Sequence, residues 1–249
     1  MNLMSSRTVW YFIIGNGVVF IFLNECLRGY FSVRVYSAYS KTIRQTSYGK
    51  WFLILIAVTT AIFLVDPLLL RGIQSIHHPI WMSLVEFGAW FGRGYNLWFL
   101  IIGTYIFLTV IKKIKWARRS FGVLLSVVIS AVISFVVKRA FLRARPDVNL
   151  GHLSFFHLNG LFHDKSTFQS FPSGDVAIVA GAAAFLFYAI KNQYLRWAIL
   201  AAPVLTALSR MSLNRHWPSD TVFPFGMGLI VALLVWQYQK CLANSKEAA

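Results

Sequence analysis

Long runs of apolar residues, separated by short polar segments, dominate the chain. A helix that crosses the hydrocarbon core of a bilayer needs about 20 apolar residues. The runs that approach this length are residues 51–70, 97–111, 121–137, 176–190, 195–208 and 221–236. They lack the polar face of a helix on a soluble bundle. The pattern predicts an all-α protein, a polytopic membrane bundle with six core transmembrane helices.

A shorter apolar run, residues 9–23, precedes this core. Asn16 interrupts it, and Asn24 and Glu25 end it. No small-x-small cleavage site follows, which argues against a signal peptide. We expect a short N-terminal apolar helix, and the sequence leaves open whether it is re-entrant, interfacial or an extra span.

Residues 76–91 repeat apolar positions at helical spacing between the first two core runs. This pattern predicts an amphipathic helix lying on the outer leaflet, with Trp81 and Trp90 at the level of the lipid headgroups. His77 and His78 begin the segment, but no further residue at ligand spacing accompanies them, so no metal site is expected.

Composition agrees with a membrane protein. The chain is 57% hydrophobic and 13% charged, against about 25% charged residues in soluble domains. The nine Trp and ten Tyr residues cluster near the ends of the runs, as interfacial aromatic belts do. Cys26 and Cys241 lie far apart and are expected to be free thiols. We expect an N-terminal segment (1–50), a six-span core (51–238) and a tail (239–249).

The net charge of +16 could indicate a nucleic-acid partner, but its distribution does not. Lys and Arg gather in the loops on one side of the six spans, around residues 28–50, 112–119, 191–196 and 240–246. The positive-inside rule assigns that side to the cytoplasm. The opposite loops, 71–96, 138–174 and 211–220, contain all six histidines. We therefore expect a site on the periplasmic face of a bacterial inner membrane.

The first candidate segment, KRAFLRARP (138–146), closes the third span. Lys138 and Arg145 are two helical turns apart and share one face, and Pro146 biases the chain out of helix. With Arg139 and Arg143 they favour anion binding. The alternative is that these side chains extend from the helix end toward the membrane surface.

The second segment, PSGD (172–175), opens the fourth span. Ser173 and Gly174 precede a helix start whose free N–H groups can bind phosphate. The alternative is simple helix capping, because Ser and Asp are both good N-cap residues.

The third segment, SRMSLNRHWPSD (209–220), joins the fifth and sixth spans. The guanidinium of Arg210 suits bidentate phosphate contact. His216 and Asp220 lie four residues apart, within reach of each other if the turn is helical. A carboxylate so placed fixes the tautomer of the imidazole and raises the basicity of its other nitrogen.

Taken together, Lys-x6-Arg-Pro, Pro-Ser-Gly-x and Ser-Arg-x5-His-x3-Asp resemble the three-part signature of the type-2 phosphatidic acid phosphatase superfamily. That superfamily includes bacterial acid phosphatases and vanadium haloperoxidases. The resemblance covers residues 51–236. It implies that His216 is the nucleophile, that Asp220 orients it, and that no cofactor or metal is needed. The phosphate would be held by Lys138, Arg145, Ser173, Gly174, Ser209 and Arg210.

Asp175 departs from the family pattern, in which a histidine usually follows Pro-Ser-Gly and protonates the leaving group. Either Asp175 carries a proton when substrate is bound and acts as the acid, or the leaving group needs little help. A diphosphate or an anomeric sugar phosphate would be such a substrate. The Gly-Asp pair and the Arg-Met-Ser…His…Ser-Asp string also resemble bacterial lipid A 4′-phosphatases, whose leaving group does need an acid.

The resemblance implies an integral-membrane lipid phosphate phosphatase acting on a lipid A-type or polyprenyl diphosphate-type substrate through a phosphohistidine. Alternatives are a lipid-to-lipid phosphotransferase or a phosphatidylglycerophosphate phosphatase. A vanadate-dependent oxidase is poorly supported in a membrane-embedded chain. An anion transporter would place its charges near the midplane of the membrane, whereas here they lie at span ends. The loop 147–171 is expected to border the site, and the oligomeric state is not encoded in any motif.

Overall fold

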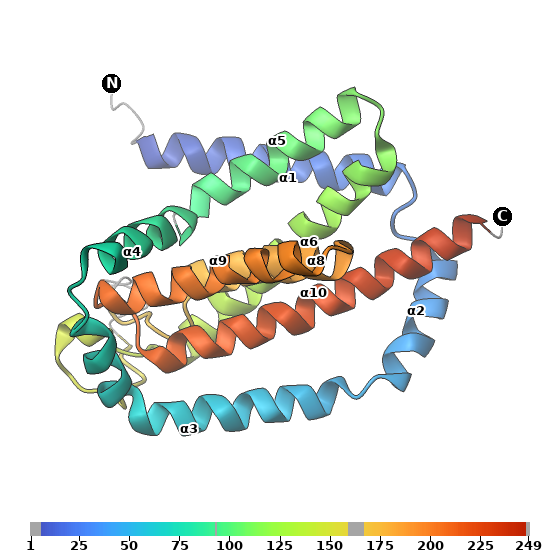
Figure 1. The fold of residues 1–249 in the computed structure, drawn as a ribbon. Coiled ribbons are helices and arrows are strands. Elements are labelled where there is room, and N and C mark those ends of the chain that lie inside the picture. The colour runs from blue at the N-terminus through green and yellow to red at the C-terminus, as the bar shows by residue number, and fades with distance from the viewer. Residues whose placement is uncertain (1–5, 93, 159–166, 248–249) are drawn as a thin grey trace.

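The computed structural model describes residues 6–92, 94–158 and 167–247, and this part of the chain is all-α (Figure 1). The helices are α1 (Ser6–Leu27), α2 (Val33–Gln45), α3 (Tyr48–Gln74), α4 (Pro79–Gly92), α5 (Gly94–Val110), α6 (Ile114–Phe141), η1 (Pro146–Val148), α8 (Gly174–Ala189), α9 (Gln193–Ser212) and α10 (Pro218–Glu247).

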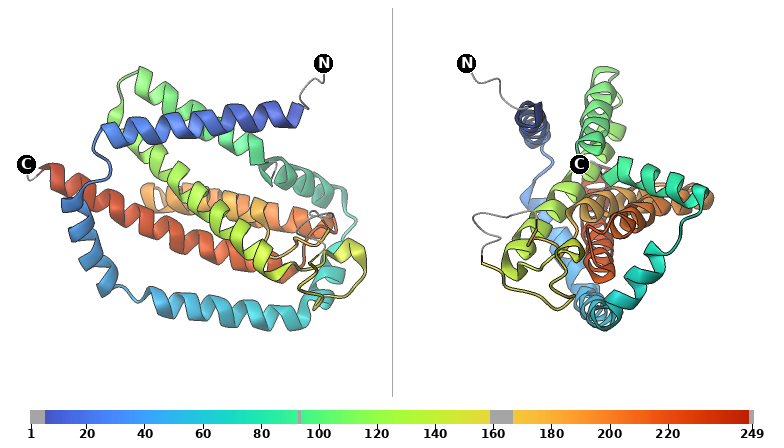
Figure 2. Two further views of the ribbon diagram at one scale, coloured as in Figure 1. Left: turned by 180° about the vertical axis from the view of Figure 1, so that it is seen from behind. Right: turned by 90° about the vertical axis from the view of Figure 1, so that its left-hand side faces the viewer.

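The long helices run roughly along one axis, with α2 across one end and the loop between α6 and α8 at the other (Figures 1 and 2). The central helix α8 contacts α6, α9 and α10. Small residues allow this close packing. A Cβ added at Gly181 would lie 2.9 Å from Ser130 Oγ, and one added at Gly228 would lie 2.8 Å from Ala180 Cβ.

Four of the six predicted core runs fall wholly within one helix, and the runs 97–111 and 176–190 extend one residue beyond α5 and α8. In the described part of the chain, three stretches are long and apolar enough to cross a membrane: Tyr48–Gln74, Ile114–Val148 and Pro218–Ser245. The helices α5 and α8 are also apolar but have only 17 and 16 residues. Helix α9 has 20 residues and includes Arg196 and Arg210 near its ends. The α10 helix continues beyond the expected core boundary to Glu247.

The N-terminal apolar run forms the 22-residue helix α1, which lies beside α5 and points in the same direction (Figure 1). Trp10 packs edge-on against Phe99, with ring centroids 5.2 Å apart. Near the other end, the Tyr105 hydroxyl donates to Glu25 Oε1 at 2.7 Å. Glu25 is fully buried. The run is therefore a helix that packs along α5; its apolar part, Ile13–Leu27, is shorter than the candidate membrane spans among the described residues.

A second feature of Glu25 is its charge environment. Arg28 Nη1 lies 3.3 Å from Glu25 Oε1, and Arg118 Nε lies 3.7 Å from Oε2. Breaking a buried ion pair leaves an uncompensated charge, which is strongly unfavourable. The pairing therefore fastens the end of α1 to the start of α6.

Helix α4 corresponds to the expected amphipathic segment, but that expectation is wrong about its character. Its buried stripe, Val85, Gly88 and Gly92, packs on α9. Its outer face is also mostly apolar, with Phe87 55% and Trp90 49% exposed. A helix that is apolar all round suits contact with both protein and lipid.

The two ends of the bundle differ as the sequence predicts. The basic segments lie at the end that holds α2, whereas the loops 75–78, 142–158 and 213–217 lie at the opposite end (Figure 1). These loops carry five of the histidines; His163 lies outside the described residues.

This asymmetry generates a prediction on membrane orientation. In a chain with Cys26 and Cys241 replaced by alanine, a cysteine at position 150 should react with a membrane-impermeant thiol reagent in intact cells. A cysteine at position 113, on the basic side, should react only after the cells are opened. Leu150 and Lys113 are both exposed in the structure, so access alone should not separate them. The reverse labelling pattern would invert the topology.

Candidate active site

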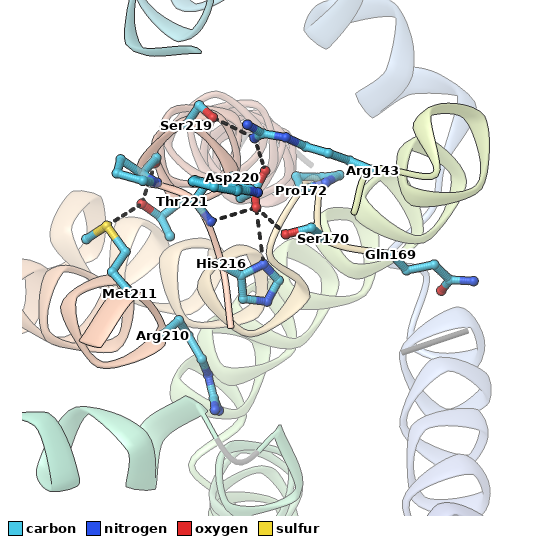
Figure 3. A network of polar contacts seen from close by, with 12 residues as sticks. Arg143, Gln169, Ser170, Pro172, Arg210, Met211, His216, Ser219, Asp220 and Thr221 are labelled. Atoms are coloured by element: carbon cyan, nitrogen blue, oxygen red, sulfur yellow. Dashed lines mark hydrogen bonds and ion pairs between the residues drawn. The ribbon is translucent and has the colours of Figure 1, made fainter. Parts of the chain in front are cut away.

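Three sequence segments that are far apart in the chain meet at one end of the bundle (Figure 3). The backbone N–H of Ser173 donates to the carbonyl of Asp220 at 2.8 Å, joining the start of α8 to the start of α10. The Trp217 indole N–H donates to the carbonyl of Ala144 at 3.0 Å, and the N–H of Ser170 donates to the carbonyl of Arg143 at 3.0 Å. The predicted convergence of the three segments is present.

His216 lies in the short connection between α9 and α10, and Asp220 lies in the first turn of α10. Both side chains are buried. His216 Nδ1 is 3.6 Å from Asp220 Oδ2, which is too long for a hydrogen bond. Asp220 Oδ2 also accepts hydrogen bonds from the backbone N–H of Trp217, at 2.9 Å, and from the Ser170 hydroxyl. These contacts hold the carboxylate beside the edge of the imidazole that carries Nδ1 (Figure 3).

The environment of His216 decides its charge. Burial lowers its pKa to about 4, and the positive charges of Lys138 and Arg145 act in the same direction. Asp220 opposes these effects, but burial and the two cations outweigh it. The imidazole is therefore neutral at pH 7, and one nitrogen keeps its lone pair.

Three cations come from two of the three segments. Lys138, in the last turn of α6, donates from Nζ to the carbonyl of Gln169 at 2.8 Å. Its side chain also borders the start of α8, since a Cβ added at Gly174 would lie 3.7 Å from Lys138 Cε. Arg145 follows α6, and Arg210 lies in the last turn of α9. The predicted phosphate-binding cations therefore gather around the helix N-terminus that the sequence singled out.

Several buried polar atoms of this cluster have no hydrogen-bond partner in the described part of the chain. They are Ser173 Oγ, Ser209 Oγ, Arg145 Nε, Arg210 Nε and His216 Nδ1. Buried polar atoms in proteins are nearly always hydrogen-bonded. An anion with several acceptor oxygens would supply partners to the two guanidinium groups and the two hydroxyls.

Asp175, in the first turn of α8, pairs with a predicted phosphate-binding residue. Its Oδ2 lies 2.9 Å from Arg210 Nε. The contact is an ion pair by distance, although its angles are not those of a hydrogen bond. Both side chains keep some exposure, 35% for Asp175 and 16% for Arg210. An incoming anion could reach the pair without disturbing the core.

Two of the basic residues in the first segment do not join the anion cluster. The guanidinium of Arg139 stacks over Phe135, 3.6 Å from the ring centroid. Arg143 is fully buried and binds carboxylates. The expectation that all four basic residues favour anion binding is therefore wrong for these two.

Arg143 joins two buried carboxylates from different helices. Its Nη1 lies 2.5 Å from Asp220 Oδ1, and its Nη2 lies 2.7 Å from Asp66 Oδ2 on α3. Ser219 bridges the same groups: its N–H donates to Asp66 Oδ1 at 2.8 Å, and its Oγ accepts from Arg143 Nη1 at 2.8 Å. Arg143 Nε donates to the carbonyl of His152 at 2.9 Å. We call this set the Arg143 network.

Aromatic rings close the Arg143 network from the sides. The guanidinium carbon lies 4.6 Å from the ring centroid of Phe63, 5.1 Å from that of Phe155 and 5.4 Å from that of Trp217. Sequence reasoning missed Asp66, Ser170 and the role of Arg143. The signal for Asp66 was a single carboxylate within a long apolar helix, which is costly unless paired.

Two glycines of α4 allow Arg210 to take its place. A Cβ added at Gly88 would lie 2.2 Å from the carbonyl oxygen of Leu205, and one at Gly92 would lie 2.6 Å from Arg210 Nη2. The first clash is with backbone and cannot be relieved by a side-chain rotation. Close approach of α4 to α9 therefore depends on glycine at position 88.

Within the described residues, no group of three or more His, Cys, Asp or Glu side chains could hold a metal ion. Asp66 and Asp220 are both engaged by Arg143.

The Arg143 network generates a prediction on stability. Arg143→Met should lower the free energy of unfolding by about 3–5 kcal/mol, because two buried carboxylates lose their cation. The measurement is unfolding in mixed detergent micelles. Arg215→Met is the matched control: Arg215 is 54% exposed and lies 3.5 Å from Asp147, so its loss should cost about 1 kcal/mol or less. Equal losses in the two variants would show that Arg143 is not a structural centre.

The comparisons with known proteins agree with this geometry. Residues 119–242 match the model of the PAP2 superfamily. A lipid A 1-phosphatase from Rhizobium johnstonii is 31% identical over 53% of this chain; the chain spans about half of that relative's length (46%). An undecaprenyl-diphosphatase from Sulfolobus acidocaldarius is 26% identical over 77% of this chain and 92% of its own.

A solved structure has the same fold. It is the crystal structure of a transmembrane PAP2-type phosphatidylglycerolphosphate phosphatase from Bacillus subtilis, with a TM-score of 0.56 and 21% identity, covering 77% of this chain and 94% of its own. The expected resemblance to lipid A 4′-phosphatases is wrong about the position, because the lipid A phosphatases that this chain resembles are 1-phosphatases. Residues 119–242 therefore resemble a PAP2 superfamily domain, and the chain shares its fold with a solved transmembrane protein of that type.

Proposed function

We propose that this protein is a membrane lipid phosphatase that removes an activated phosphate group at the periplasmic face through a phosphohistidine. The substrate is either a lipid A-type glycolipid with an anomeric phosphate or a polyprenyl diphosphate. The observation that carries the proposal is the cluster of buried polar atoms without hydrogen-bond partners that includes His216 Nδ1.

The phosphate group would sit at the N-terminus of α8. There the helix dipole and free N–H groups favour an anion. The side chains of Lys138, Arg145 and Arg210 would neutralise its charge, and Ser173 Oγ and Ser209 Oγ would donate hydrogen bonds. Preorganised cations of this kind stabilise the charge that spreads over the equatorial oxygens in the transition state.

His216 would attack with Nε2, because Nδ1 faces Asp220. A bond forms between Nε2 and phosphorus while the bond to the leaving oxygen breaks, and the leaving group takes up one proton. Asp220 stabilises the positive charge that develops on the imidazole. Water then attacks phosphorus, gives one proton to the medium, and releases inorganic phosphate and neutral His216.

Asp175 bears on the choice of substrate. It stands where the family usually has histidine, and in this structure its carboxylate pairs with Arg210. An anomeric phosphate or a diphosphate has a good leaving group and needs little acid catalysis. The Rhizobium relative is named as a 1-phosphatase, and carbon 1 of an aldose is its anomeric carbon. The Sulfolobus relative is named as a diphosphatase. The replacement of histidine by aspartate supports this substrate class.

For substrates with a poorer leaving group, such as a lipid alcohol phosphate, we further propose that Asp175 is a conditional general acid. When a phosphate dianion binds Arg210, Asp175 loses its cationic partner and gains a negative neighbour. Both changes favour the protonated carboxyl group, which can then donate to the leaving oxygen. The phosphotransferase alternative uses the same intermediate and differs only in the acceptor.

The first test is His216→Ala. Phosphate release from a lipid A 1-phosphate or from undecaprenyl diphosphate should fall by several orders of magnitude, because the nucleophile is lost. The protein should keep its helical content by circular dichroism. His77→Ala, an exposed histidine at the same end of the bundle, should keep its activity. Turnover near the wild-type rate in His216→Ala would contradict the covalent mechanism.

The second test separates the acid role of Asp175 from a positioning role. Asp175→Asn keeps the shape but cannot donate a titrating proton. It should reduce hydrolysis of a lipid alcohol phosphate by about 10²–10⁴-fold. It should reduce hydrolysis of para-nitrophenyl phosphate, measured in the same detergent, far less. Equal losses on both substrates mean that Asp175 positions Arg210, and the acid role is then wrong.

A further inference from the structure

Two cavities lie at the end of the bundle remote from His216, around the first turns of α6. The first has a volume of about 600 Å³, and four basic side chains line it: Lys115, Arg118, Arg119 and Lys240. None of its lining residues is acidic. The second has a volume of about 540 Å³ and an almost wholly apolar lining from α5, α6 and α8. Arg119 lines both cavities.

The basic cavity carries positive charge that the described residues do not neutralise. Arg118 shares the buried Glu25 with Arg28. No described carboxylate pairs with Lys115, Arg119 or Lys240, and two of these side chains stack on tryptophans instead. Arg119 lies 4.7 Å from the Trp116 ring centroid, and Lys240 lies 5.5 Å from that of Trp236. Like charges at one site repel unless an anion joins them.

The start of α6 adds to this potential. Helix α6 begins at Ile114, which also lines the basic cavity. The first N–H groups of a helix have no partner within the helix, and its N-terminus carries a partial positive charge. Three basic side chains and a helix end therefore line one cavity.

The apolar cavity identifies the kind of anion. It is a groove along α5, α6 and α8, with Leu100, Ile101 and Phe185 in its lining and Arg119 and Lys191 among its few polar residues. Leu100 is 59% exposed and Trp116 is 54% exposed, so the groove opens toward the surrounding lipid. A soluble anion would gain nothing from contact with this apolar lining, whereas an acyl chain would bury apolar surface in it. Basic pockets between membrane helices on the cytoplasmic side are suited to anionic headgroups.

We infer that this end of the protein binds one anionic glycerophospholipid of the cytoplasmic leaflet. Its headgroup phosphate lies between Lys115, Arg119 and Lys240, and one acyl chain lies in the apolar groove. The site is at the opposite end from His216, so its occupant is a structural ligand and not the substrate. It holds the start of α6 to the end of α10, the two helices that supply the basic residues.

The test uses the purified full chain in an uncharged detergent. Dioleoyl phosphatidylglycerol is titrated, and the thermal unfolding midpoint and the lipid adducts in native mass spectra are measured. We expect saturable stabilisation and one retained lipid. Dioleoyl phosphatidylcholine and inorganic phosphate should give neither effect. Stabilisation by inorganic phosphate equal to that by the lipid would overturn the lipid assignment.

Two variants and a control test the location. The triple variant Lys115→Gln, Arg119→Gln, Lys240→Gln should weaken phosphatidylglycerol binding by about tenfold or more. Ala189→Phe places a larger side chain in the groove. It should weaken the binding of dioleoyl phosphatidylglycerol more than the binding of a short-chain phosphatidylglycerol. The control triple variant Lys41→Gln, Arg44→Gln, Lys50→Gln removes the same charge from exposed positions at the same end.

Retention of wild-type binding by the control supports the site. Equal weakening in the control and pocket variants would show non-specific attraction to a basic surface and would overturn the proposal. The unfolding midpoint of each variant without lipid reports whether it folds. Because none of these measurements uses turnover, the outcome is independent of the phosphatase proposal.

Discussion

The Arg143 guanidinium is the interaction on which the rest of the site depends. It lies in a fully buried position between Asp66 of α3 and Asp220 of α10. Charged groups in a low-dielectric interior are tolerated only when paired and hydrogen-bonded. Here every nitrogen of the guanidinium has an acceptor, and aromatic rings exclude water. The cost of burying the charges is offset only if three segments of the chain are in place together.

This arrangement links folding to chemistry. Asp220 contacts both Arg143 and His216, and Arg143 is held in turn by Asp66 of α3. The orientation of the imidazole therefore depends on α3, a helix that lies outside the three signature segments. The same logic applies at Arg210, whose position depends on the glycines of α4. In both cases a residue of the candidate site is held by a segment outside the three signature segments.

Much of the fold could be predicted because lipid imposes a simple pattern. Every apolar run of sufficient length became a helix, and the spacing of His216 and Asp220 was enough to place them together. Contacts between distant positions could not be predicted. Asp66 and Arg143 are 77 residues apart, and no local pattern shows which cation a lone carboxylate will meet. The packing of α1 beside α5 likewise depends on Tyr105 and Glu25, which are 80 residues apart. The apolar outer face of α4 escaped a periodicity argument because both of its faces are apolar.

The ion pair between Asp175 and Arg210 has a consequence for product inhibition. A carboxylate tethered beside a guanidinium competes with any soluble anion at an effective concentration of about millimolar or more. In the proposed reaction, inorganic phosphate would have to break this pair each time it rebound. The same competition would lower the affinity of a lipid substrate by the same factor, but the acyl chains that hold the substrate in the bilayer would leave it with the higher remaining affinity. An internal carboxylate would thus clear the product from the site while leaving the membrane-anchored substrate able to enter.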